Sequence, residues 1–200
     1  MAITNGYTTL AVAKTLLGVT LTTHEADLER AIEAASRTID QVAGRRFYAD
    51  GSATARIYTP DHPKTLFVDD ISTTTGLVVA SETTYGTWGQ SWTINDWTGS
   101  YGFRVEPADY GAPYWRLEAL SGVWPETRHS VSVTATWGYP SVPTEIAQAC
   151  LLLATRYYKR KDTPFGLLDN PNAGATALPK TDPDVYGLVM RHRRYADTSR

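Results

Sequence analysis

The sequence predicts an α+β fold, with a helical core, an inserted antiparallel β-domain and an extended C-terminal tail. Three observations indicate it: a pair of helical patterns near the N-terminus, a long apolar helical pattern after residue 142, and patterns of period two between them. We therefore expect residues 1–45 and 139–162 to form the helical core, residues 46–138 the β-domain, and residues 163–200 a loop and docking tail.

The N-terminal helix pair has recognisable ends. Residues 8–17 form a short helical pattern that Gly18 ends. Thr22 and Glu25 have the spacing of a capping box, in which each side chain accepts a backbone N–H at the start of a helix. The second helix is expected over residues 23–43, with Gly44 as its stop. Its apolar face consists of Leu28, Ala31, Ile32, Ala35, Ile39 and Val42.

Residues 46–138 follow the period of β-strands. Ala53, Ala55 and Ile57 alternate with polar residues, which predicts a strand with these three side chains facing the core. A second alternating run has its apolar members at Val131, Val133, Ala135 and Trp137. Five further apolar segments lie between them, at residues 66–68, 77–80, 92–94, 103–105 and 115–117. Glycine-containing turns separate these segments, which is typical of an antiparallel sheet.

A helix begun by a proline follows the β-domain. Pro143 suits a first helical turn because its missing N–H is not needed there, and the pattern continues to about residue 162. We expect this helix to pack against the second N-terminal helix. The residues predicted to form that core are Leu28, Ile32, Ile39, Ile146, Leu153 and Tyr157.

The C-terminal part differs from the rest of the chain. Residues 163–181 are rich in Pro, Gly and Asn, which predicts a loop without regular structure. Residues 182–195 contain a short helical pattern with Asp182 as its cap, and we expect residues 182–200 to be mobile in the free protein. The first 155 residues contain 10 basic and 16 acidic residues, whereas the last 45 contain 9 basic and 5 acidic residues. The basic end is suited to an acidic partner, although a solvated helix end would have the same composition.

Composition bounds the class of protein. With 42% hydrophobic and 20% charged residues, the chain is typical of a globular domain. It has no apolar run of about 18–20 residues and no signal-peptide pattern, so we expect no membrane partner and synthesis in a cytoplasm. The net charge of −2 disfavours a free nucleic-acid binder. The single cysteine, Cys150, lies among apolar residues and is interpreted as a buried structural residue rather than a nucleophile.

Motifs for catalysis or cofactor binding are missing from the sequence. The four histidines are not spaced as metal ligands, and no nucleophile elbow, phosphate loop or dinucleotide fingerprint is present. We therefore expect no cofactor, no metal and no enzymatic activity. Two alternatives remain open: a carboxylate site in the β-domain of a hydrolase, and an aromatic platform that binds glycans. The candidate carboxylates are Asp61, Asp69, Asp70, Glu106, Asp109 and Glu118. The candidate aromatics are Trp88, Trp92, Trp97, Trp115, Trp124, Tyr85, Tyr101, Tyr110 and Tyr114.

Two stretches carry a resemblance to a known family. LERAIEAASRTIDQVAGRRFY (28–48) precedes the β-domain, and VTATWGYPSVPTEIAQACLLLATRYYKRKDTPFG (133–166) follows it. In this order they resemble the head-tail connector proteins, also called adaptor or head-completion proteins, of long-tailed double-stranded DNA phages. The resemblance covers both ends of the chain well and the β-domain only loosely.

The resemblance implies a structural role in a virion, at the interface between head and tail. Members of the family form a ring, usually of twelve copies, under the portal protein, where they extend the DNA channel. They offer a platform to the tail, through a tail terminator or a second head-completion protein. Double-stranded DNA passes the ring without sequence-specific binding, and the acidic body of this chain suits such a conduit. The family's C-terminal segment reaches the portal, and the residues implied here are Tyr186, Leu188, Arg191, Arg193, Arg194 and Tyr195.

Overall fold

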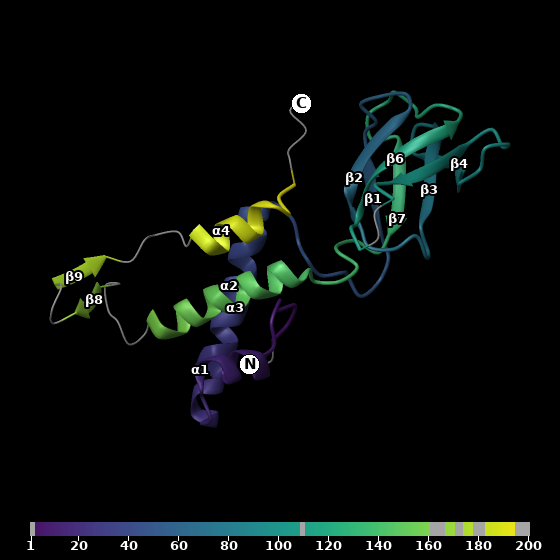
Figure 1. Cartoon of the computed structure of the whole chain (residues 1–200). Coiled ribbons are helices and arrows are strands. Elements are labelled where there is room, and N and C mark those ends of the chain that lie inside the picture. The colour runs from purple at the N-terminus through teal and green to yellow at the C-terminus, as the bar shows by residue number, and fades with distance from the viewer. Residues whose placement is uncertain (1–2, 109–110, 161–166, 171–173, 178–182, 195–200) are drawn as a thin grey trace. The chain divides into compact units, whose positions relative to one another are not determined.

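The computed structural model confirms the α+β class and divides the chain into two compact units (Figure 1). The structure describes residues 3–108, 111–160, 167–170, 174–177 and 183–194. Residues 1–47 and 142–200 form the helical unit, and residues 48–141 form the β unit. No helix in these described ranges is long and apolar enough to cross a bilayer.

The helical unit begins with α1 (Leu10–Leu17), a short 3₁₀ turn (Thr22–His24) and α2 (Glu25–Ala43). Thr9 caps α1 by accepting the N–H of Val12, at 3.3 Å. The predicted capping box at Thr22 is wrong, because Thr22–His24 forms the 3₁₀ turn and no side chain caps α2. The carboxylate of Glu25 instead pairs with the ammonium group of Lys14, at 2.5 Å. This ion pair ties α1 to the start of α2.

Helix α3 (Thr144–Lys159) packs across α2 to form the core of the helical unit (Figure 1). The apolar stripes of the two helices supply its buried side chains, because neither stripe could remain exposed without a large hydrophobic cost. Alanines at positions 31, 35, 149 and 154 are buried in this unit. Small side chains let two helix backbones approach closely, and the Sγ of Cys150 lies 3.3 Å from the Oγ of Ser36 on α2.

The C-terminal part is more structured than expected. Two short strands, β8 (Leu167–Asn170) and β9 (Gly174–Ala177), pair as an antiparallel hairpin within the segment predicted to be an irregular loop. The predicted short helix is present as α4 (Pro183–Met190). It is not part of an extended tail, since it packs against α3 and α2 with Val185 and Val189 buried. Burial of these two valines explains why α4 docks.

The β unit contains a seven-stranded sheet. Its strands are β1 (Thr54–Tyr58), β2 (Thr65–Ile71), β3 (Val78–Thr84), β4 (Thr87–Ile94), β5 (Gly102–Glu106), β6 (Tyr114–Ser121) and β7 (Val131–Ala135). Their order in the sheet is β1-β7-β3-β4-β5-β6-β2. The expectation of a wholly antiparallel sheet is wrong at one pair, because β4 and β5 run parallel over two residue pairs. The side chain of Asp96 holds the loop between these two strands, because its carboxylate accepts the N–H groups of Thr98 and Gly99.

The sheet curls until its two ends nearly meet. Ile71 at the end of β2 forms an isolated antiparallel bridge with Trp137, just beyond β7. Two further backbone hydrogen bonds support it: Ser72 N–H to Thr136 O, at 2.9 Å, and Gly138 N–H to the carbonyl oxygen of Asp70, at 2.7 Å. The N–H of Asp50 donates to the carbonyl oxygen of Trp137, at 2.7 Å, so the segments that enter and leave the β unit lie side by side.

The core of the β unit lies inside this nearly closed sheet. The predicted alternation of the last strand is confirmed, because its four apolar side chains from Val131 to Trp137 are fully buried. The first strand has the opposite orientation from the one expected, and Ile57 is 54% exposed. Tyr58 instead packs against the core, and the guanidinium of Arg56 lies 4.4 Å from the centre of a Trp137 ring. This cation–π contact offsets part of the cost of placing a charged arginine, rather than an isoleucine, on the side of the strand that faces the core.

Candidate functional site

The six residues implied to dock on the portal lie on α4 and the segment after it. Tyr186 is 46% exposed, while Leu188 is half-buried. Arg191 and Arg193 are exposed, and Arg194 is half-buried. The last of the six, Tyr195, lies outside the described residues. The described face of this segment therefore offers one aromatic ring and two guanidinium groups to a partner.

The segment after α4 is fixed to the end of α2. The N–H of Arg194 donates to the carbonyl oxygen of Ala43, at 3.0 Å. The ring of His192 stands edge-on against Phe47, with 5.9 Å between ring centres, and its Nε2 lies 3.8 Å from a carboxylate oxygen of Glu145. Burial lowers the pKa of His192, although Glu145 opposes this shift. The neutral ring is thus the form that suits this position.

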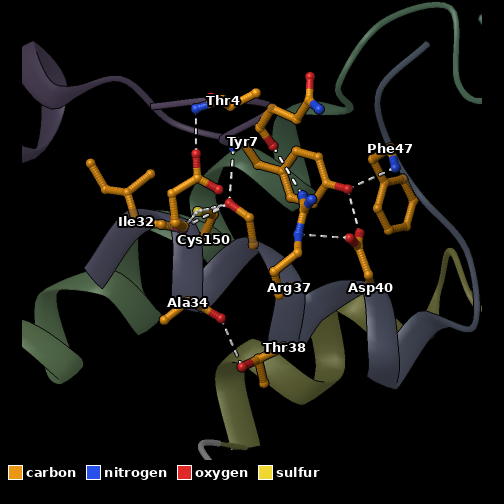
Figure 2. A network of polar contacts seen from close by, with 12 residues as sticks. Thr4, Tyr7, Ile32, Ala34, Arg37, Thr38, Asp40, Phe47 and Cys150 are labelled. Carbon is orange, nitrogen blue, oxygen red and sulfur yellow. Dashed lines mark hydrogen bonds and ion pairs between the residues drawn. The ribbon is translucent and has the colours of Figure 1, made fainter. Parts of the chain in front are cut away.

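A polar network on the other side of Phe47 ties the N-terminal segment to α2, as Figure 2 shows. The hydroxyl of Tyr7 donates to the carboxylate of Asp40 and accepts the N–H of Phe47, at 2.9 Å. The N–H of Tyr7 donates to the hydroxyl of Ser36, at 3.1 Å, and Arg37 pairs with Asp40, at 3.1 Å. Burial raises the pKa of Tyr7, and the neighbouring Asp40 raises it further. Burial also raises the pKa of Asp40.

Sequence reasoning missed this network. Tyr7 precedes the first helix in a segment without periodicity, and no motif connects it with residues 40 and 47. Cys150, by contrast, lies where the sequence placed it. Its side chain is fully buried between α2 and α3, and burial raises the pKa of its thiol. A protonated thiol in this position is a poor nucleophile, so the geometry favours a packing role.

The residues predicted to form the helical core lie on α2 and α3, which pack against each other. Five of them are buried, namely Leu28, Ile32, Ile39, Ile146 and Leu153. The sixth, Tyr157, is half-buried, and its hydroxyl lies 3.1 Å from that of Thr38. Two elements separated by about a hundred residues in the sequence thus share one apolar interface.

The candidate aromatic residues of the β unit differ in how far they are buried. Trp92 and Trp124 are buried and stack on each other, with 3.9 Å between ring centres. The exposed ones are Tyr85, Trp88, Trp97 and Tyr101. Trp115 and Tyr114 are half-buried, and Tyr110 lies outside the described residues. The aromatic density of this part of the sequence is therefore partly core packing, which leaves fewer rings for a glycan platform.

The candidate carboxylates are engaged by arginines. Arg104 pairs with Glu118 and Glu106, and Arg116 also pairs with Glu106, so these groups form a ladder across β5 and β6. Asp69 accepts hydrogen bonds from Arg56, at 2.7 Å, and from the hydroxyl of Tyr58, at 3.0 Å.

Two of the remaining acidic candidates lie within the described residues. Asp70 is buried within β2, and Asp61 is exposed. Asp109 is outside the described residues. Among the residues that the structure describes, no three His, Cys, Asp or Glu side chains are grouped as metal ligands.

Comparison with known proteins bears on the fold. The chain matches no protein-family model, and no curated protein matches it. A chain in the neck of an empty gene transfer agent particle, computed with C6 symmetry, is similar with a TM-score of 0.58 and 22% identity, over 98% of this chain and 94% of that chain. The two chains share a fold. A chain in the virion of the native gene transfer agent particle is similar with a TM-score of 0.53 and 22% identity, again over 98% and 94%.

Proposed function

We propose that this chain is a structural virion protein, a head-to-tail connector that forms a ring under the portal of a phage-like particle. The observation that carries the proposal is the fold shared with a chain of a particle neck, over 98% of this chain and 94% of the other. The similarity extends over nearly the whole of both chains, so it covers both the helical unit and the β unit. The resemblance of residues 28–48 and 133–166 to connector proteins supports the same assignment from the sequence.

The proposed assembly is a ring of twelve copies that extends the DNA channel. The related neck was computed with C6 symmetry, with which rings of six and of twelve copies are both compatible. DNA would pass through the ring without sequence-specific contacts. The excess of acidic residues in the first 155 positions suits this role, because a wall that attracted phosphate would hold the DNA.

The proposed portal contact is the exposed face of α4 with the residues that follow it. Tyr186, Arg191 and Arg193 are exposed there and could meet an acidic surface of the portal. Guanidinium groups speed the encounter with such a surface, and an aromatic ring supplies buried contact area. The opposite end of the ring would carry a tail terminator or a second head-completion protein.

A non-catalytic role is supported by the state of the carboxylates in the β unit. Glu106 and Glu118 each pair with an arginine across the neighbouring strands β5 and β6, and Asp69 on β2 pairs with Arg56 on β1, at the other end of the strand order. A catalytic carboxylate must be able to reach a substrate, whereas these carboxylates are engaged by guanidinium groups. These pairs therefore fit a role in stabilising the sheet.

The portal protein of the same particle provides the test. We expect the purified chain to bind assembled portal rings in co-sedimentation and to form a closed ring on them in electron micrographs. Arg191→Glu with Arg193→Glu should weaken this binding at least about tenfold, since charge pairs at interfaces contribute on the order of 1.5 kcal/mol or more. The matched control is Arg30→Glu with Arg128→Glu, which makes the same change of charge at two other exposed arginines. Absence of binding by the wild-type chain at micromolar concentrations would refute the proposal.

A further inference from the structure

Three separate parts of the chain meet at Phe47. Its side chain is fully buried, and two rings stand edge-on against it: Tyr7 from the N-terminal segment, at 5.7 Å, and His192 from the segment after α4, at 5.9 Å. Phe47 is also the last residue of the helical unit, directly before Tyr48 at the start of the β unit. We call Phe47 with these two rings the Phe47 anchor.

The two contacts on Phe47 differ in kind. Tyr7 fixes the backbone, because its hydroxyl accepts the N–H of Phe47, at 2.9 Å, while donating to Asp40 on α2 (Figure 2). His192, in contrast, contacts the side-chain ring of Phe47. The N–H of Phe47 is a buried donor, and a buried N–H needs an acceptor, so the Tyr7 hydroxyl helps to fix where Phe47 lies. The position of the His192 contact thus depends on the Tyr7 hydroxyl.

Other contacts also hold α4 and the segment after it. They include the hydrogen bond from Arg194 N–H to Ala43 and the burial of Val185 and Val189 on α4. A short helix of eight residues is marginal in isolation, so its docked state depends on these contacts. Loss of the ring contact on Phe47 is therefore expected to loosen α4 on the helical unit.

We propose that Tyr7 is a positioning residue for α4: by fixing Phe47 it sets how firmly residues 183–194 are held on the helical unit. The N-terminal segment is thereby coupled to the surface that would dock on the portal. A neighbouring copy that displaced residues 3–9 in a ring would loosen α4 and make it available. The coupling is a property of the helical unit alone, whereas its meaning for assembly rests on the proposed function.

Hydrogen exchange of the purified full-length chain tests the coupling. Tyr7→Phe keeps the ring and removes the hydroxyl, so the contact with the Phe47 backbone is lost. Amides of residues 183–194 should then exchange about fivefold faster relative to those of α3, since one net hydrogen bond corresponds to about that factor. Dividing the exchange rate of residues 183–194 by that of α3 cancels the effect of any change in the stability of the whole helical unit. The measurement does not involve the portal.

The matched control is Tyr157→Phe, which removes another hydroxyl contact of the same unit, the one with Thr38 at 3.1 Å. It should leave the ratio of residues 183–194 to α3 at the wild-type value. An unchanged ratio in Tyr7→Phe, or an equal rise in both variants, would overturn the proposal. The expected rise of the ratio in Tyr7→Phe, together with no portal binding by the wild-type chain, would instead reject the proposed function and leave the coupling in place.

The reciprocal variant covers the case in which Tyr7→Phe does not fold. Coupling between two sites acts equally in both directions, so His192→Ala should speed exchange of the Phe47 amide, which donates to Tyr7, by a similar factor. His24→Ala is its control, because the ring of His24 stands edge-on against Tyr158, at 6.3 Å, rather than against Phe47. A Phe47 amide that exchanges at the wild-type rate in His192→Ala would contradict the coupling.

Discussion

Replacement of Gly138 by alanine should strongly destabilise the β unit. Gly138 has a φ of 111°, which side chains other than glycine rarely adopt. A Cβ atom there would overlap the carbonyl oxygen of Tyr48 and lie 2.9 Å from its carbonyl carbon and 3.1 Å from the Cα of Ala49. All three obstructing atoms belong to the backbone, so no side-chain rotation relieves the overlap.

The expected cost follows from three contributions. Strain at a φ that disfavours alanine costs about 1–2 kcal/mol, and overpacking against a fixed neighbour costs about 1–3 kcal/mol. A shift of this segment also weakens the hydrogen bonds from Gly138 to Asp70 and from Asp50 to Trp137, each 2.7 Å long and each contributing about 1 kcal/mol. The free energy of unfolding of the β unit should therefore fall by about 3–6 kcal/mol.

Tryptophan fluorescence reads this change selectively. The chain has six tryptophans, and all of them lie between residues 88 and 137, within the β unit. Urea unfolding followed by fluorescence thus reports on this unit, while ellipticity at 222 nm follows the helices. With an m-value of about 1–2 kcal/mol/M, Gly138→Ala should lower the fluorescence midpoint by about 2 M or more.

Gly86→Ala is the matched control. Gly86 also has a positive φ, 78°, but nothing lies within 4 Å of a Cβ added there. It should cost only the strain, about 1–2 kcal/mol. Equal midpoints for the two variants would refute the reasoning, because they would mean that the contact with the Tyr48 backbone contributes nothing.

Two further predictions concern the helical unit and pH. Ile32→Asp puts an unpaired charge at a fully buried position, so the 222 nm unfolding midpoint should correspond to a loss of about 3–5 kcal/mol; a midpoint equal to that of the exposed control Gln41→Asp would contradict the core assignment. Burial raises the pKa of Tyr7 and of Tyr58 in the folded state. The unfolded chain therefore loses these protons first as the pH rises through about 10, and each tyrosine lowers stability by up to about 1.4 kcal/mol per pH unit above that value. Urea titrations at pH 9 and 11 measure the effect, Tyr58→Phe should remove the share seen by fluorescence, and an unchanged wild-type midpoint between these pH values would count against it.

The sequence predicted those elements whose patterns are local. The last strand alternates cleanly from Val131 to Trp137, and its orientation was correct because every apolar member needed burial. The first strand was placed correctly but turned the wrong way. Arg56 lies against a Trp137 ring and Tyr58 donates to the carboxylate of Asp69, and a partner on another strand cannot be seen in a pattern of five residues.

The parts that sequence reasoning did not reach depend on contacts between distant segments. The parallel pairing of β4 with β5 and the bridge from Ile71 to Trp137 are set by the curl of the sheet rather than by either segment alone. Docking of α4 was missed for a related reason. Val185 and Val189 form too short a stripe to indicate what would cover them, and the contact of Tyr7 with Phe47 spans 40 positions.

The hydrogen bond between Asp50 and Trp137 has a consequence for how the two main helices find each other. Without it, a free loop of about 100 residues would separate the end of α2 from the start of α3. When the β unit is folded, this hydrogen bond holds residues 50 and 137 together. Only about a dozen residues, those between this bond and the two helices, then remain to be ordered. Loop-closure entropy scales as 1.5RT times the logarithm of loop length, so the pairing of α2 with α3 becomes about 2 kcal/mol less costly. The stability of the helical unit thus includes a contribution that comes from chain connectivity rather than from contact.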